Sequence, residues 1–463
     1  MQLDIVNDKA QTEVGSYFVA NYPPFSVWSA EHLPAAMRAL DTAVGTGCHT
    51  EKNRVASALR SESTPVENRC HTPLGLYIHI PFCRKRCKFC YFRVYTDKNS
   101  EDVEVYLDAL SREVELYADR AALRGREFDF VYFGGGTPSF LSSEQLQRFI
   151  DRISKRWRWE HAREVTFECE PGTLKKSKLE TIKAIGVTRL SLGVEHFDDE
   201  VLTLGGRAHK SPEIFRSYEW IQEVGFPQVN IDLIAGMVGD TESKWRSTVE
   251  QAIGFAPDSV TIYQMEVPHN TVIAKESKET GSQTPVPNWA TKRAWVDHAF
   301  RAFERAGYEV SSGYTLVRKS THKGFVYRDA LWHGADLIGT GVASFSHLSG
   351  VHYQNLDSWE GYVGSLTRGE LPLSRALATT DRERLTRELI LQLKLGRIDA
   401  GYFRTKFGVE IAGEFRDAIG SLATESLVEV HGDEWRLSRD GLLRVDALLP
   451  RFFEPRFRDI RYT

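Results

Sequence analysis

From Leu74 onward, short β-rich runs of residues alternate with longer amphipathic runs. The β-rich runs cover residues 76–80, 128–133, 164–169, 187–193, 229–235 and 259–265. Alternation of this kind is typical of βα units, which build a parallel sheet covered by helices. Six such units predict an α/β fold, a partial (β/α)6 barrel. In a barrel of this kind the chemistry is expected at the carboxyl ends of the strands, where the connecting loops meet.

The runs between the predicted strands have the spacing of helices that bury one face. Within residues 143–157 the apolar side chains recur three or four positions apart, at Leu146, Phe149, Ile150, Ile153 and Trp157. Ser142 and Gln145 have the spacing of a capping box, in which each side chain bonds the backbone N–H of the other residue. Residues 102–123 and 289–306 show the same periodicity, and we predict helices over all three ranges.

The first 73 residues lie outside this alternation. They are irregular, with the aromatic run YPPFSVW at 22–28 and a polar run at 45–54. We predict that residues 1–73 form an N-terminal extension that packs on the main domain, with a linker near 60–73.

The pattern changes again after residue 375. It becomes helix, turn and helix, followed by a strand pair at 427–438 and a last helix at 440–453. This order resembles a winged-helix-like α+β module. Because the charges of the module are mixed and no basic cluster is present, we expect a cap over the barrel mouth rather than a nucleic-acid reader. The expected units after the extension are therefore the barrel over 74–360 and the module over 375–463.

Composition and charge narrow the class of partner. The chain has 59 Lys and Arg against 63 Asp and Glu, a formal net charge of −4, so it lacks the basic surplus that phosphate-backbone binding needs. It has neither an apolar run long enough to span a membrane nor a basic-then-apolar export signal at its start. We expect a cytoplasmic protein that acts on a small molecule, with neither nucleic acid nor a membrane as partner.

Three of the six cysteines stand within eight residues, directly after the first predicted strand. Cys83, Cys87 and Cys90 have C-x3-C-x2-C spacing. Three thiolates on a short loop can bind three irons of a cubane iron–sulfur cluster and leave the fourth iron open to a small molecule. The alternative is a structural zinc site, which needs a fourth ligand such as His79 or Cys70.

The run YIHIPFCRKRCKFC, from Tyr77 to Cys90, resembles the signature of radical S-adenosylmethionine (SAM) enzymes, and more narrowly that of the oxygen-independent coproporphyrinogen III dehydrogenases. The resemblance extends over roughly residues 74–455. It implies a [4Fe-4S] cluster on the three cysteines and SAM bound to the open iron. Reduction of the cluster then cleaves SAM to a 5′-deoxyadenosyl radical.

Four further segments resemble the SAM-binding motifs of this family. They are FGGGTPSFL at 133–141, TFECEPGTL at 166–174, LSLGVEHFDDEVLTLGGRAHK at 190–210 and NIDLIAGMVGDT at 230–241. The resemblance implies SAM contacts from Gly134, Gly135, Gly136, Thr137, Glu168, Glu195, Arg207, Asp232 and Ile234. In this sequence Glu170 stands where relatives often carry Asn, and Glu195 where they usually carry Gln. Cys169 is expected to be a buried thiol.

The resemblance leaves three activities open. A methylase or cyclopropanase of the family's class C branch is the main expectation, in which one SAM gives the radical and a second SAM donates the carbon to an sp2 centre. The altered residues after the cluster, the extension and the segment at 345–355 favour it. The alternative is oxidative decarboxylation as in the dehydrogenases, which Phe92 disfavours because it replaces a further family cysteine. A heme-trafficking homologue comes third, since such chains begin almost at the cysteine motif.

Candidate catalytic groups follow from the same placement. Tyr77 and His79 precede the cluster on one face of the first strand, and Tyr263 and Glu266 follow the sixth strand. Tyr263, Glu266 and His333 are candidates for the general base. Tyr77 and His79 are candidates for contact with a second SAM or for proton transfer, and an equal alternative for His79 is that it fixes the cluster loop by hydrogen bonding. Four basic residues interleave with the cysteines and are candidates for docking an acidic electron donor such as flavodoxin or ferredoxin: Arg84, Lys85, Arg86 and Lys88.

Overall fold

The computed structural model describes residues 19–44, 72–282, 286–321, 324–458 and 460. The polar run at 45–54, most of the expected linker near 60–73, Cys48 and Cys70 lie outside the described residues. In the described part, no helix is both long and apolar enough to cross a membrane.

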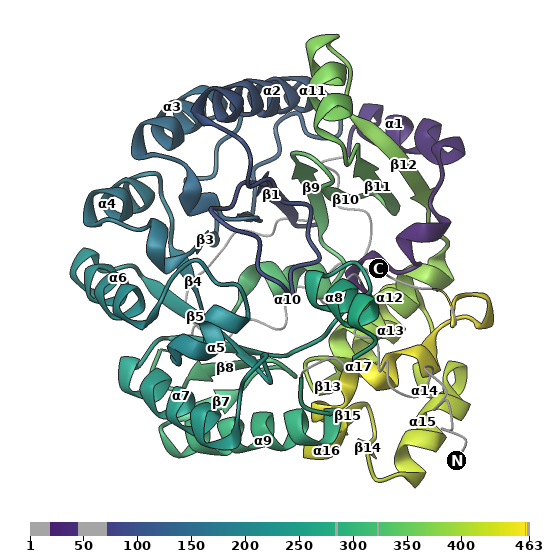
Figure 1. Cartoon of the computed structure of the whole chain (residues 1–463). Helices are drawn as coiled ribbons and strands as arrows, with labels where there is room; N and C mark the ends of the chain where they lie inside the picture. The colour runs from purple at the N-terminus through teal and green to yellow at the C-terminus, as the bar shows by residue number, and fades with distance from the viewer. Residues whose placement is uncertain (1–18, 45–71, 283–285, 322–323, 459, 461–463) are drawn as a thin grey trace.

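A single large sheet forms the centre of the molecule (Figure 1). Its order is β12-β11-β10-β9-β1-β2-β3-β4-β5-β6-β8-β7, and the seven strands from β9 to β6 run parallel. The strands are β1 Leu74–Ile80, β2 Phe130–Gly135, β3 Glu164–Cys169, β4 Arg189–Glu195, β5 Gln228–Ala235, β6 Ser259–Gln264, β7 Tyr308–Val310, β8 Thr315–Arg318, β9 Asp336–Thr340, β10 Phe345–Leu348, β11 Val351–Asn355 and β12 Leu373–Ala378. The six strands expected from the sequence are confirmed as β1 to β6.

The edges of the sheet differ from a simple six-unit barrel. The strand β9 comes late in the chain but pairs in parallel with β1, with Leu74 opposite Asp336. Beyond β9 and beyond β6 the sheet continues with antiparallel strands. The last of them, β12, ends at Ala378, so the large sheet extends past residue 360, the expected end of the barrel.

Helices line the outer side of the sheet (Figure 1). They are α2 Ser100–Ala118, α3 Ser143–Ile153, α4 Lys176–Ala184, α6 Ser211–Val224, α7 Glu242–Phe255, α9 Trp289–Arg305 and α11 Trp359–Thr367. Three further helices lie elsewhere: α5 Asp199–Leu204 and α8 Val272–Thr280 are next to the loop that contains Lys88, and α10 Val326–Trp332 lies on the inner side of the sheet. The predicted capping box is present, because Ser142 and Gln145 bond each other's backbone N–H. The predicted helix over 143–157 ends earlier, at Ile153, but Trp157 is still buried.

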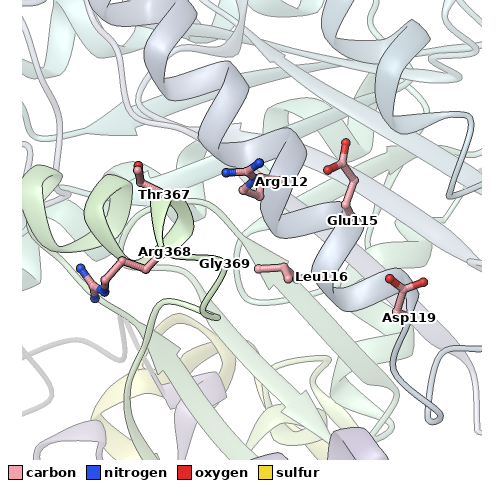
Figure 2. A pocket seen from close by; sticks show the side chains of 7 residues that line it. All are labelled: Arg112, Glu115, Leu116, Asp119, Thr367, Arg368 and Gly369. Atoms are coloured by element: carbon pink, nitrogen blue, oxygen red, sulfur yellow. The ribbon is translucent and has the colours of Figure 1, made fainter.

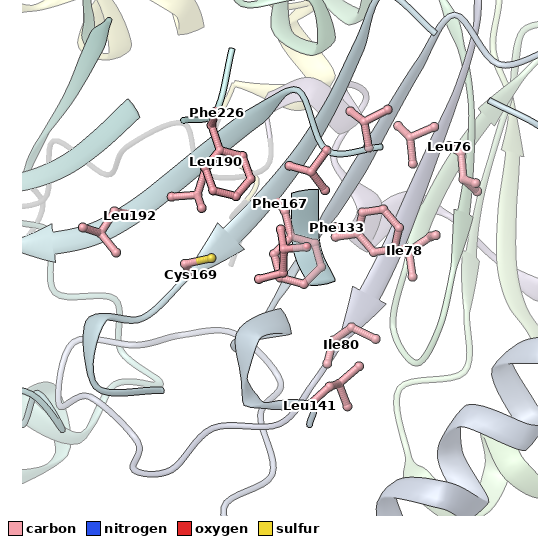
Figure 3. Close-up of a cluster of buried hydrophobic side chains, with 14 of the residues drawn as sticks. Leu76, Ile78, Ile80, Phe133, Leu141, Phe167, Cys169, Leu190, Leu192 and Phe226 are labelled. Atoms are coloured by element: carbon pink, nitrogen blue, oxygen red, sulfur yellow. The ribbon is translucent and has the colours of Figure 1, made fainter. Parts of the chain in front are cut away.

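Strand alternation divides the sheet into an apolar outer face and a polar inner face. The outward side chains of β1 to β4 pack under the helices, where Figure 3 shows Leu76, Ile78, Phe133, Phe167 and Leu190 together. Cys169 lies in the same cluster, and burial raises its pKa well above the usual range. It is therefore the buried thiol that the sequence indicated. The inner face is left for polar side chains.

The C-terminal module packs beside the open side of the barrel (Figure 1). It consists of α12 Asp381–Leu393, β13 Arg397–Asp399, α13 Ala400–Phe407, α14 Ile411–Glu414, α15 Arg416–Thr424, β14 Val428–His431, β15 Glu434–Leu437, α16 Arg439–Leu443 and α17 Val445–Leu448. The prediction of one last helix over 440–453 was wrong, because the helix breaks at Arg444. There the Leu443 carbonyl accepts a hydrogen bond from Gln264 Nε2 of the barrel, at 3.1 Å.

The described part of the N-terminal extension joins the other two parts. It contains three short turns of helix between Val19 and His32, followed by α1 Leu33–Asp41. Tyr22 is fully buried in the core of the C-terminal module, and its hydroxyl accepts a hydrogen bond from the backbone N–H of Glu454 at 3.1 Å. Ser29 pairs with Ala376 of β12. The extension therefore contacts the barrel and the module at the same time.

Candidate active site

A cavity of about 630 Å³ opens at the carboxyl ends of β1 to β6. The loop with the three cysteines forms one part of its wall, and the ends of β2 to β6 form another. The remaining wall comes from α10, from the C-terminal module and from Ala20 of the extension. This is the place where a parallel barrel is expected to hold its chemistry.

The three cysteines of the motif all line this cavity. Cys83 Sγ lies 3.3 Å from Thr137 Oγ1, and Arg207 Nη1 donates to Cys87 Sγ at 3.3 Å. Burial raises the pKa of Cys83 to about 12 and that of Cys90 to about 11. Thiolates at these positions need a cationic partner such as iron, so the donor set fits a metal cluster better than free thiols.

The zinc alternative lacks its fourth ligand in the part of the chain that the structure covers. Among the described residues, no three His, Cys, Asp or Glu side chains are grouped to hold a single metal ion. A cubane cluster, by contrast, spreads its protein ligands over separate irons. His79, one proposed zinc ligand, does not line the cavity, and Cys70 is outside the described residues.

An ion pair anchors the cysteine loop to β3. Arg84 donates from Nε and Nη2 to the Glu170 carboxylate at 3.2 and 3.0 Å, and His209 Nδ1 donates to Glu170 Oε1 at 2.8 Å. Burial alone would raise the pKa of Glu170, but the hydrogen bonds from His209 and Arg84 lower it to about 2. The acid that replaces the family's Asn therefore holds the loop between Cys83 and Cys87.

The glycine-rich loop passes close to the cysteine loop. A Cβ atom on Gly136 would lie 2.8 Å from the Pro81 carbonyl carbon, so only glycine fits there. Gly135, Gly136 and Thr137 line the cavity, as expected for SAM contacts, whereas Gly134 does not. Gly134 lies within β2, where its open side faces the Tyr132 ring.

Three carboxylates face the same cavity near the cysteine loop: Glu168, Glu195 and Asp232. Burial raises the pKa of Glu168 and of Glu195 to about 7 and also raises that of Asp232. Tyr132 donates to Glu168 at 2.6 Å, and Arg207 Nη1 lies 3.6 Å from Glu195. Clustered carboxylates in an enclosed space favour a cationic ligand, and Arg207 adds one donor for an anionic group. Ile234 lines the same cavity.

The aromatic wall of the cavity adjoins Glu168 through Tyr132 and was not predicted from the sequence. Tyr132 and Tyr327 lie with ring centroids 4.5 Å apart, and Phe325 is next to both. Alternation along β2 could have indicated Tyr132. The other two follow β8 in a segment without a motif, and only long-range packing brings them here.

The four candidate catalytic residues fall into two groups. Tyr263 and Glu266 line the cavity, whereas Tyr77 and His79 do not. The hydroxyl of Tyr77 and Nδ1 of His79 lie 3.3 Å apart, and burial lowers the pKa of His79 to about 4. His79 packs under Gly135, where it supports the glycine loop.

His333 lies at the end of α10 against the C-terminal module and also does not line the cavity. Three of the four basic residues around the cysteines have partners within the chain. Arg84 pairs with Glu170, Lys88 pairs with Glu276 at 2.9 Å, and Arg86 donates to the Cys90 carbonyl. Donor docking by these residues stays a prediction.

A second pocket, of about 460 Å³, lies on the outer surface between α2 and α11 (Figure 2). Arg112, Glu115, Asp119 and Arg368 line it. Their charges are mixed, and the pocket lies on helices that cover the outside of the sheet. Unlike the cavity at the strand ends, it has no cysteine or aromatic ring among its described lining residues.

Comparison with known proteins agrees with this architecture. Residues 77–252 match the model of the Radical SAM superfamily. The chain is 27% identical over 382 residues to "Heme chaperone HemW" of Bacillus subtilis, covering 81% of this chain and 98% of that protein. It is 27% identical over 387 residues to "Oxygen-independent coproporphyrinogen III oxidase" of Escherichia coli, covering 81% and 80%.

A solved structure is similar as well. Coproporphyrinogen III oxidase (HemN) from Escherichia coli, described as a radical SAM enzyme, superposes with a TM-score of 0.73 at 24% identity, over 82% of this chain and 90% of that one. The expected radical SAM fold is confirmed. The expectation of a class C methylase or cyclopropanase was wrong, because these relatives are a heme chaperone and coproporphyrinogen oxidases. The departures from the family motifs, which had suggested a class C enzyme, occur in a chain that is similar to these relatives.

Proposed function

We propose that this protein is an enzyme that removes hydrogen from a carboxylate-bearing tetrapyrrole, in the manner of the oxygen-independent coproporphyrinogen III oxidases. The chain has the radical SAM fold, and its residues 77–252 match that superfamily. The observation that carries the proposal is the lining of a single cavity at the strand ends. It combines three thiols and three carboxylates with aromatic rings and cationic side chains.

The thiols and carboxylates of the lining suit the cofactors that the superfamily implies. Cys83, Cys87 and Cys90 would hold a [4Fe-4S] cluster, which together with bound SAM supplies a 5′-deoxyadenosyl radical. Glu168 and Asp232 would attract the cationic parts of SAM, and Arg207 would receive its carboxylate as a planar donor.

Other residues of the lining suit a flat acidic substrate. Tyr327, Phe325, Arg328 and Lys394 line the cavity; within the chain Arg328 also pairs with Asp329 and Lys394 with Asp446. Aromatic faces stack on conjugated rings, and guanidinium groups bind carboxylates. A tetrapyrrole that carries acid side chains combines the two features.

Phe92 replaces the additional cysteine of the coproporphyrinogen dehydrogenases without disturbing the three cluster cysteines. Its ring lies 4.4 Å from that of Tyr91 and lines the cavity. The residue is thus placed to contact the substrate, and we propose that it adapts the cavity to a substrate that differs from coproporphyrinogen in its side chains.

The test is anaerobic turnover of the reconstituted protein with coproporphyrinogen III and related tetrapyrrole acids, with dithionite or a flavodoxin or ferredoxin system as reductant. We expect 5′-deoxyadenosine and carbon dioxide, and loss of both in Cys83→Ala, Cys87→Ala or Cys90→Ala. Tight heme binding without 5′-deoxyadenosine would overturn the enzymatic proposal and indicate a chaperone.

The expected number of SAM molecules belongs to the same proposal. The cavity of about 630 Å³ lies in the range of sites that hold a drug-sized ligand. Equilibrium dialysis with labelled SAM, with and without substrate, measures the stoichiometry. Two molecules per cluster are expected, and one would contradict this part of the proposal.

A further inference from the structure

Glu195 lines the cavity although the pairing of its strand does not direct it there. It ends β4, and the register between β4 and β5 shifts at this point, so that Glu195 is opposite Leu233. Paired residues of neighbouring strands point to the same side of a sheet. Leu233 is buried in the apolar core, between Asp232 and Ile234, which line the cavity, and Glu195 nevertheless lines the cavity too. A strand irregularity of this kind can redirect one side chain.

The backbone at Glu195 has a conformation that side-chain-bearing residues rarely adopt. Its φ is +67°, and the N–H of His196 donates to the Val194 carbonyl at 2.8 Å. This bond closes a three-residue γ-turn around Glu195, and a γ-turn with a positive φ at its centre is rare and strained. Such a conformation persists only where the surrounding structure holds it.

The contacts that hold the turn come from a buried pair behind the cavity wall, His196 and Asp240. Nδ1 of His196 accepts from the Asp198 N–H at 3.0 Å, so Nε2 carries the proton and donates to Asp240 Oδ1 at 3.2 Å. Thr248 Oγ1 lies 3.2 and 3.3 Å from the two ring nitrogens. The second oxygen of Asp240 accepts from the Gly236 N–H at 3.1 Å. The pair therefore connects the loop after β4 to the loop after β5.

We propose that His196 and Asp240 are positioning residues, which keep the γ-turn closed and so keep the Glu195 carboxylate beside Arg207 in the cavity wall. Glu195 Oε1 lies 3.6 Å from Arg207 Nη1, and Arg207 Nη2 donates to the Gly193 carbonyl at 2.9 Å. A looser turn would move the acid and leave the guanidinium less ordered. The inference rests on the proposed function, because it takes SAM as the ligand that Glu195 and Arg207 contact.

Asp240→Asn tests the pair without changing the volume of the side chain. One acceptor oxygen becomes an NH2 donor, so the amide cannot accept from both the imidazole N–H and the Gly236 N–H as the carboxylate does. We expect the dissociation constant of SAM from the reconstituted protein, measured by equilibrium dialysis without reductant or tetrapyrrole, to rise about tenfold. The rate of 5′-deoxyadenosine formation at saturating SAM should stay near that of the wild type.

Asp258→Asn is the matched control. Asp258 Oδ2 accepts from the Val229 N–H at 2.8 Å, at the other end of β5, so it also binds a backbone N–H of this part of the chain. The same substitution there should leave the affinity for SAM unchanged. His196→Gln, whose amide N–H can take the place of the imidazole donor, should recover most of the affinity that His196→Ala loses.

A double-mutant cycle separates positioning from a general loss of structure. If the pair acts through Glu195, Asp240→Asn should hardly change the affinity for SAM in a Glu195→Ala background, whereas independent effects would multiply. Amide hydrogen exchange of residues 194–198, measured without any ligand, should be faster in Asp240→Asn than in the wild type or Asp258→Asn.

An unchanged affinity for SAM in Asp240→Asn, an unchanged exchange rate, or effects of Asp240→Asn and Glu195→Ala that multiply would overturn the inference. None of these measurements uses a tetrapyrrole. A failed tetrapyrrole assay on a protein that binds SAM therefore counts against the proposed function alone.

Discussion

Glu170 illustrates how one substituted residue can acquire a structural task. It joins the cysteine loop to β3 through Arg84, and His209 fixes the other side of the same carboxylate. The sequence marked Glu170 as a departure from the family pattern. It could not reveal the partner, because 86 positions separate Glu170 from Arg84.

Glu170→Gln should therefore loosen the cysteine loop. We expect a loss of about 2 kcal/mol in unfolding free energy, less than for a fully buried pair because the Arg84 side chain is 35% exposed. The cluster absorbance of the reconstituted variant should also decay several-fold faster in air. Glu276→Gln breaks the exposed pair with Lys88. It should change the unfolding free energy by no more than a few tenths of a kcal/mol and leave the decay rate of the cluster absorbance as in the wild type.

The stability difference between wild type and Glu170→Gln should also depend on pH. Hydrogen bonds lower the pKa of Glu170 to about 2 in the folded protein, against an ordinary value of 4.5. The stabilisation is therefore complete above pH 4.5 and is lost as the pH falls toward 2. Urea titrations of both apoproteins across this window measure the difference, and a difference that does not vary with pH would contradict the ion pair.

At the scale of helices and strands, the sequence pattern predicted the elements correctly where they depend on contacts between residues close together in the chain. The strands β1 to β6 and the cap of α3 follow from alternation and from one capping pair. The place of β9 beside β1, the antiparallel edges and the break at Arg444 depend on residues distant in the chain. The motifs expected to bind the cluster and SAM were recognisable for the same reason, since each occupies a few consecutive residues. The aromatic wall was not, because its residues come from separate segments of the chain.

The cap of α3 gives a prediction at this scale. Ser142→Ala removes the hydroxyl that accepts from the Gln145 N–H at 3.1 Å. The loss should be about 1 kcal/mol in unfolding free energy, measured by urea denaturation. Ser154→Ala, at the exposed other end of the helix, is the control and should cost less than half as much. Equal effects would mean that the capping box contributes nothing specific.

At the scale of the whole molecule, the N-terminal extension contacts both the barrel and the C-terminal module. Arg387 of α12 donates to the Ala20 carbonyl at 2.6 Å, and Tyr22 is buried in the module. Tyr22→Ala should cost about 3–5 kcal/mol, because it empties a fully buried aromatic site. Val430→Ala, at a residue that is 43% exposed, is the control.

The expected consequence of Tyr22→Ala is a separation of the two parts before either unfolds. Limited proteolysis should then cut the chain between β12 and α12, at Thr379 or Thr380, well below the melting temperature. A single cooperative transition, without early cleavage and with a loss under 1 kcal/mol, would show that the extension is not needed as a link.

The cavity wall contains Ala20 from the extension, Tyr132 from the barrel and Asp446 from the module. The complete binding site therefore exists only in chains in which all three segments have docked. A ligand that binds this assembled form alone acts as a non-covalent crosslink, and at a hundred times its dissociation constant it would add about 2.7 kcal/mol to the docked state. In a cell, the supply of substrate would thereby set how long each molecule survives proteolysis.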